Sequence, residues 1–169
     1  MKTIFRITRS LLEGIRKDLR RRHVHAYERV GFVTCRFGLV RWADLLCLAH
    51  GYFPVADEDY IEDRMFGALI GSAAFRKAMQ LAYTQNVGLF HIHLHGHPGV
   101  PTPSGIDIRE TAKFVPDFFH VRPNLPHGAI VLSSDSLSAR IWLSAAAKPK
   151  PIDQFSIIGA PLMTIAGLR

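Results

Sequence analysis

Histidines at every second position of one short segment have the clearest chemical potential in this sequence. Residues 90–98 read Phe-His-Ile-His-Leu-His-Gly-His-Pro. Side chains of a β-strand point alternately to opposite faces, so an extended segment places all four imidazoles on one face: His91, His93, His95 and His97. Two imidazoles separated by one residue at a strand end can both reach one metal ion. The pattern therefore predicts a metal site.

A carboxylate that could complete this site lies downstream, after a linker rich in Pro and Gly. Asp107 is expected to begin a short helix. Catalytic zinc usually has three protein ligands and an open position for water, whose pKa falls to about 7. Ser104, three residues earlier, could cap the helix or donate a hydrogen bond to an oxyanion beside the metal. Both roles remain open at this stage.

Together these residues resemble the JAMM motif of the JAB/MPN metalloprotease family, which combines His-x-His-Pro, a linker and Ser-x-x-Asp. The family also has an upstream glutamate, commonly within Glu-x-x-Gly, and Glu28 to Gly31 supplies that pattern. The order of the expected elements follows the family over most of the chain. The resemblance implies a mixed β-sheet flanked by helices, a cytidine-deaminase-like α/β sandwich, and one Zn²⁺ per chain.

The resemblance also assigns roles to individual residues. His95 and His97 correspond to the imidazole ligands, Asp107 to the carboxylate ligand, Glu28 to the general base and Ser104 to the residue that steadies the tetrahedral intermediate. In the family, the linker between the second histidine and the serine is one residue longer than the linker between His97 and Ser104. It is one residue shorter than the linker between His95 and Ser104. Because Pro98 follows His97 directly, we assign the pair His95/His97 and expect His93 to line the substrate cleft.

The activity implied is zinc-dependent hydrolysis of the amide bond after the C-terminus of a ubiquitin-like modifier, by deconjugation or precursor processing. The modifier's tail is the expected partner, and a bacterial conjugation or antiviral defence operon is the expected setting. Two alternatives remain: a non-catalytic MPN scaffold, and a JAB-type hydrolase of small amino-acid conjugates.

Composition is that of one globular domain spanning residues 1–169. Apolar residues make up 48% and charged residues 21%, which is ordinary for a folded domain. Cys35 and Cys47 are too few for a disulfide scaffold. The sequence shows neither a secretory signal nor an apolar run of the roughly 20 residues that a membrane span needs, so we expect a cytoplasmic protein without a membrane partner.

The net charge of +7 comes mainly from one basic stretch within the first 22 residues. This stretch lacks interleaved aromatic residues, so it offers no stacking platform for single-stranded nucleic acid. Nucleic acid is therefore not the expected partner. The apolar segment from Ala160 to Leu168 could form an oligomer interface.

Hydrophobic periodicity predicts alternating helices and strands. We expect helices over residues 10–23, 64–83 and 107–114, and a hairpin of residues 30–37 and 39–48 that turns at Gly38. Further strands are expected over residues 3–7, 87–95, 129–133, 139–144 and 155–158, the last one ending the sheet. We expect residues 56–63 and the turn after Pro98 to form the cleft walls.

Overall fold

The computed structural model describes residues 1–40, 43–63 and 67–166 of the chain. They form a mixed α/β domain built on a nine-stranded sheet of order β7-β6-β5-β4-β2-β3-β1-β8-β9. The strands are β1 Thr3–Thr8, β2 Val30–Val40, β3 Asp44–Pro54, β4 Gly88–Leu94, β5 His127–Leu132, β6 Leu137–Trp142, β7 Lys150–Pro151, β8 Gln154–Ile158 and β9 Met163–Ala166. The helices are α1 Arg9–Leu19, α2 Ser72–Gln85 and α3 Gly105–Phe114, with the 3-10 helices η1 Asp57–Asp59 and η2 Val115–His120.

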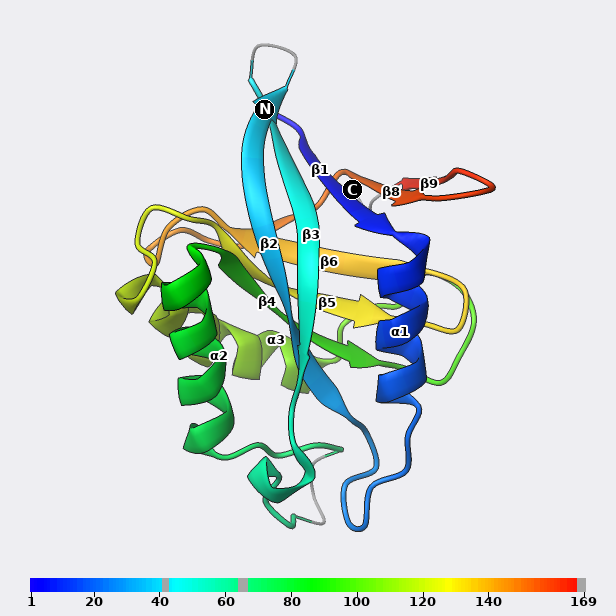
Figure 1. The fold of residues 1–169 in the computed structure, drawn as a ribbon, viewed down its shortest axis with the longest axis vertical. Helices are drawn as coiled ribbons and strands as arrows, with labels where there is room; N and C mark the ends of the chain where they lie inside the picture. The colour runs from blue at the N-terminus through cyan, green and yellow to red at the C-terminus, as the bar shows by residue number, and fades with distance from the viewer. Residues whose placement is uncertain (41–42, 64–66, 167–169) are drawn as a thin grey trace.

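Helices lie on both faces of the sheet, with α1 apart from α2 and α3 (Figure 1). One hydrophobic cluster joins α1 to residues such as Phe90 and Ile92 of β4. A second cluster joins α2 and η2 to the opposite face, where Leu89 packs. The alternation along β4 therefore puts His91 and His93 on one face, as the sequence pattern predicted, and that face is the one covered by α2 and α3.

The hairpin of β2 and β3 is confirmed, but the predicted turn at Gly38 is wrong. Gly38 lies inside β2 and pairs with Leu46 of β3, and the antiparallel pairing continues to Val40 and Asp44. Residues 41–42, at the tip, lie outside the described residues. Gly38 is simply tolerated in the strand, because a methyl group there would meet no atom within 4 Å.

The predicted helix over residues 64–83 begins later, at Ser72. Residues 64–66 lie outside the described residues, and Gly67 to Gly71 are not helical. Their backbone groups are used elsewhere: Leu69 accepts from Ile61 and Gly71 donates to Asp59. These hydrogen bonds to the segment after η1 hold the chain extended, so the helix starts only beyond Gly71.

The C-terminal part of the sheet has two strands that the sequence did not predict, β7 and β9. The expected strand over residues 155–158 is present as β8, which pairs with β1 in parallel. It is not the last strand, because β9 folds back and pairs antiparallel with β8. Part of the apolar segment expected to form an oligomer interface is therefore an edge strand, although Leu162 before it is 69% exposed.

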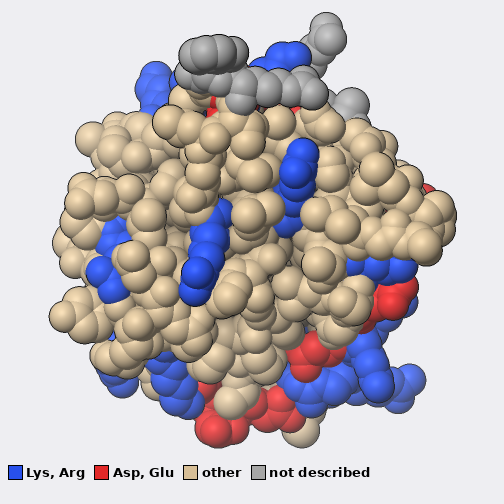
Figure 2. All heavy atoms as spheres, turned by 45° about the horizontal axis from the view of Figure 1, so that its top comes forward, with Lys and Arg blue, Asp and Glu red and all other residues tan. Residues whose placement is uncertain are grey.

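Two surface properties bear on partners. Among the described helices, none combines the length and apolar character needed to cross a bilayer. On the face that Figure 2 presents, Lys and Arg side chains stand as separate groups among uncharged residues, and at its lower edge they mix with Asp and Glu. That face carries no continuous basic patch of the kind that nucleic-acid binding requires.

Candidate metal centre

The histidine-bearing strand β4 lies in the middle of the sheet. It pairs antiparallel with β2 and parallel with β5. The strand ends at Leu94, but the backbone amide of His95 still donates to Leu132 of β5 at 2.8 Å. The neighbouring strand therefore holds His95 in line with His93, one step beyond the end of β4.

Three ligand-type side chains converge at this end of β4: His93, His95 and Asp107. The Nε2 atoms of His93 and His95 lie 3.1 Å apart. His93 Nε2 lies 3.4 Å from Asp107 Oδ1, and His95 Nε2 lies 3.6 Å from Asp107 Oδ2. Tetrahedral ligands at the usual zinc distances of about 2.0–2.1 Å lie about 3.3 Å from one another. The two Asp107 distances run to different carboxylate oxygens, and with one atom taken from each residue all three ligand atoms lie within 4.8 Å of one another. The group could therefore close around a small divalent ion.

Asp107 is held in place by the start of α3. Its Oδ2 accepts from the backbone amide of Ser104 at 2.7 Å, and the Ser104 hydroxyl accepts from the amide of Asp107 at 3.1 Å. This reciprocal pair is a capping box. Burial acts to raise the pKa of the Asp107 carboxyl, but hydrogen bonds from His93 and Ser104 outweigh it and hold that pKa well below its usual range. Asp107 is thus a charged, oriented carboxylate.

His97, which the sequence assigned as a ligand, is not part of this group. It is exposed, and its Nδ1 lies 3.0 Å from the carbonyl oxygen of Pro98. The strand alternation that linked it to His95 stops at Leu94, after which the chain bends away through residues 96–100. The geometry thus brings His93 rather than His97 together with His95 and Asp107.

His91, the first of the four histidines, lies deeper in the sheet and is buried. Its ring packs against Phe32 and Phe114, with centroid distances of 5.8 and 5.1 Å. Burial, followed by the charge of His93, lowers the pKa of His91 to about 3. His91 is therefore neutral near pH 7 and forms part of the wall behind the three converging groups.

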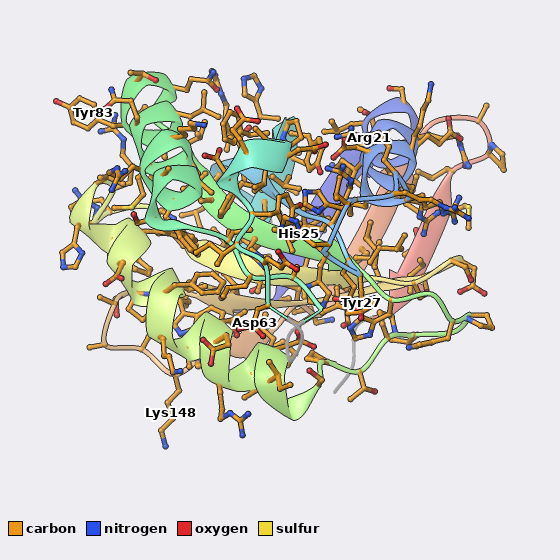
Figure 3. All side chains as sticks on the ribbon, turned by 90° about the horizontal axis from the view of Figure 1, so that it is seen from below. Arg21, His25, Tyr27, Asp63, Tyr83 and Lys148 are labelled. Atoms are coloured by element: carbon orange, nitrogen blue, oxygen red, sulfur yellow. The ribbon has the colours of Figure 1, made fainter. Side chains whose placement is uncertain are left out.

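Glu28, the predicted general base, faces the same cavity as His93 and Asp107. Its backbone amide and that of Tyr27 both donate to the carbonyl of Gly67, at 3.0 and 2.9 Å. A methyl group at Gly67 would lie 3.0 Å from Glu28 Oε2. Figure 3, which views this end of the molecule, shows Tyr27 on the segment that leads from α1 into β2. Gly67 therefore positions the segment that carries Glu28.

The electrostatics of His95 agree with this arrangement. Burial lowers the pKa of His95, and the charge of His93 adds to that effect, whereas the carboxylates of Asp107 and Glu28 oppose it. A lowered pKa keeps the imidazole neutral at pH 7, which is the form that binds a metal.

The cavity beside these groups has a volume of about 270 Å³. The predicted wall of residues 56–63 is not among its lining residues, and neither is the turn after Pro98. The walls come instead from the segment Gly67–Ile70, from α2 and from α3. A glycine before a helix can mark a close backbone approach, and Gly67 is such a position, because Glu28 lies against it.

Comparisons with known proteins add no further identification. No protein-family model matches the chain, and no curated protein matches it.

Proposed function

We propose that this chain is a zinc-dependent peptidase of the JAB/MPN type, which hydrolyses the amide bond after the C-terminus of a ubiquitin-like modifier. The observation that carries the proposal is the convergence of His93, His95 and Asp107 at one point, with the Glu28 carboxylate facing the same cavity. Two imidazoles, a carboxylate and a nearby base are the set that metal-assisted hydrolysis requires.

In this proposal the metal ligands are His93, His95 and Asp107. A zinc ion held there would polarise the scissile carbonyl and lower the pKa of a water to about 7. Glu28 takes a proton from the attacking water and delivers it to the leaving amine, as a general base that then acts as a general acid.

Ser104 supports both the helix and the reaction. A hydroxyl has one donor and two acceptor positions. The Ser104 oxygen accepts from the amide of Asp107, and its proton, which is within reach of the Asp107 carboxylate, could be donated instead to an oxyanion next to the site. The capping and oxyanion roles are therefore compatible.

The finer features of the fold and setting belong to the same proposal. We assign the helix-covered sheet to the MPN-like, cytidine-deaminase-like sandwich, because β2 carries Glu28 at its entrance, β4 carries the histidines at its end and α3 begins with Ser104 and Asp107. We place the protein in the cytoplasm, with the extended tail of a ubiquitin-like modifier as its partner.

The experiment is incubation of the purified protein with a ubiquitin-like protein fused to a C-terminal extension, with and without a chelator, alongside a measurement of zinc content. We expect bound zinc, cleavage, and loss of cleavage on chelation. Alkylation of thiols should not inhibit, because Cys35 and Cys47 are both fully buried and burial raises their thiol pKa values. A chain that folds but binds no zinc would favour the non-catalytic scaffold.

A further inference from the structure

The cavity beside the metal centre has apolar walls and reaches well past the ligands. Its inner lining includes Val30, Ile70, Phe75 and Phe114. Phe75 and Phe114 are only partly buried, whereas Phe32 and Phe118, which pack against Phe75, are fully buried. The aromatic surface that Phe75 and Phe114 leave uncovered thus lines the cavity.

The cavity is large enough to take a bulky side chain. Pockets that enclose drug-sized ligands occupy about 300–1,000 Å³, and this one, at about 270 Å³, falls just below that range. Its charged lining groups include Glu110 and Lys113, which pair with each other at 2.8 Å. An apolar side chain would cover the aromatic walls, whereas a glycine would leave them in water.

The position of Glu28 indicates which part of a substrate enters. Among the described residues, Glu28, His93 and Asp107 line the cavity, but Ser104 does not. In the proposed reaction Glu28 hands its proton to the leaving amine, and Ser104 faces the oxyanion of the acyl group. The residue that carries the leaving amine therefore lies on the cavity side.

We propose that this cavity binds an apolar side chain of the residue directly after the scissile bond, so that the substrate bond is a linear peptide bond to an α-amine. This inference rests on the proposed function for the orientation of the substrate. A lysine ε-amine fits less well, because its methylene stem would enter first and the rest of the conjugated protein would have to follow into a cavity of about 270 Å³.

Binding of product-like amines to the metal-free protein tests the cavity without any catalysis. Phenylalaninamide and glycinamide share the amine and differ in the side chain. We expect phenylalaninamide to bind with a Kd at least about tenfold lower, measured by NMR titration. Equal affinities would overturn the proposal.

Matched variants locate the binding. Ala68 lines the cavity, whereas Ala112 on α3 is exposed and is not among the lining residues. Ala68→Trp should fill the cavity and abolish the preference for phenylalaninamide, and Ala112→Trp should leave it unchanged. If Ala68→Trp fails to fold, Phe75→Ala gives a second test, because enlarging the cavity should shift the preference toward tryptophanamide. An unaltered preference in the folded variant would overturn the proposal.

Cleavage assays separate this inference from the proposed function. With the zinc-loaded protein, a modifier followed by Phe should be cleaved with a kcat/KM at least about 100-fold above one followed by Gly, and above a lysine ε-linked conjugate. Cleavage without this order, or with the ε-linked conjugate preferred, would overturn the cavity inference while sustaining the proposed function. Selective binding of phenylalaninamide by a protein that neither binds zinc nor cleaves would overturn the proposed function while sustaining the cavity as an apolar amine site.

Discussion

His127 and the pair His93/His95 lie on adjacent strands, β5 and β4, yet their surroundings give them different chemistry. Both ring nitrogens of His127 are bound to backbone groups: Nδ1 accepts from the amide of Leu89 at 3.0 Å, and Nε2 lies 3.1 Å from the carbonyl oxygen of Arg122. The Nε2 atoms of His93 and His95 instead face each other and the carboxylate of Asp107.

The partners of the ring nitrogens distinguish a structural histidine from a candidate metal ligand. His127 is fully buried with both nitrogens used, so it can offer nothing to an ion. The other two side chains present lone pairs to one shared point, which is stable only if a proton or a metal ion occupies that point.

The largest effect is expected from removing a ligand. His93→Ala should lose zinc and activity altogether, because the converging group drops from three members to two. His97→Ala is the matched control, since His97 is exposed and outside the group, and it should keep about one zinc per chain. The measurement is zinc content by atomic absorption. If His93→Ala retains zinc and His97→Ala loses it, the ligand pair would be His95/His97, as the sequence motif predicted.

The next effect concerns the base. Glu28→Gln keeps the size of the side chain but cannot take a proton, so hydrolysis should fall by about 10²–10⁴-fold while the zinc content stays unchanged. Glu58→Gln serves as the control, because Glu58 is exposed in η1. Undiminished cleavage by Glu28→Gln would reject its role as the base.

For His127 we expect a pH effect on stability rather than on zinc. Burial lowers the pKa of His127 to about 4, although its contact with Arg122 opposes the shift. The unfolded chain takes up this proton below about pH 6.5 and the folded chain only near pH 4. The free energy of unfolding should therefore fall as the pH drops through this window, by about 3 kcal/mol from this residue.

The variant His127→Asn isolates that contribution, because its side-chain oxygen can still accept from Leu89 but does not titrate. Denaturant unfolding between pH 7 and pH 4 should show a shallower pH dependence than in the unmodified chain. Zinc content should not change. An identical pH dependence in both proteins would contradict the assignment.

The smallest effect is expected at the helix start. Ser104→Ala removes the side-chain acceptor for the amide of Asp107 and should lower the free energy of unfolding by about 1 kcal/mol. Ser104→Thr should retain most of that stability. If cleavage by Ser104→Ala falls by far more than the fraction of folded protein, the result would support the oxyanion role. If cleavage falls only in proportion to the folded fraction, capping would be the sole role of Ser104.

Much of the fold followed from the sequence because its signals are local. The alternation of His and apolar residues along β4, and the Ser-x-x-Asp pattern before α3, each depend on neighbours in the chain. Glu28 was also singled out by a short motif, Glu-x-x-Gly, and it lines the cavity. What failed was the start of α2, because the bridge between Tyr60 and Ile70 competes with helix formation there and cannot be read from nearby residues.

The sequence assigned the pair His95/His97, whereas the side chains that converge with Asp107 are His93 and His95. The reason is similar. Pro98 after His97 favoured one pair, but the pair that converges depends on where β4 ends relative to Leu132 of β5. That endpoint is a property of strand pairing across the sheet. The aromatic cavity was missed because Phe75 and Phe114 come from different helices and meet only in the folded chain.

The capping box at α3 has a consequence for how the chain would capture an ion. Ordering a flexible side chain carries an entropic penalty, which a ligand normally incurs when the ion arrives. The hydrogen bond from the Ser104 amide to Asp107 Oδ2 fixes that carboxylate as soon as the helix forms. The entropic cost of ordering the side chain is therefore incurred during folding. If the site takes a metal, Asp107 would be a preorganised ligand for it, since its Oδ1 is already turned toward His93.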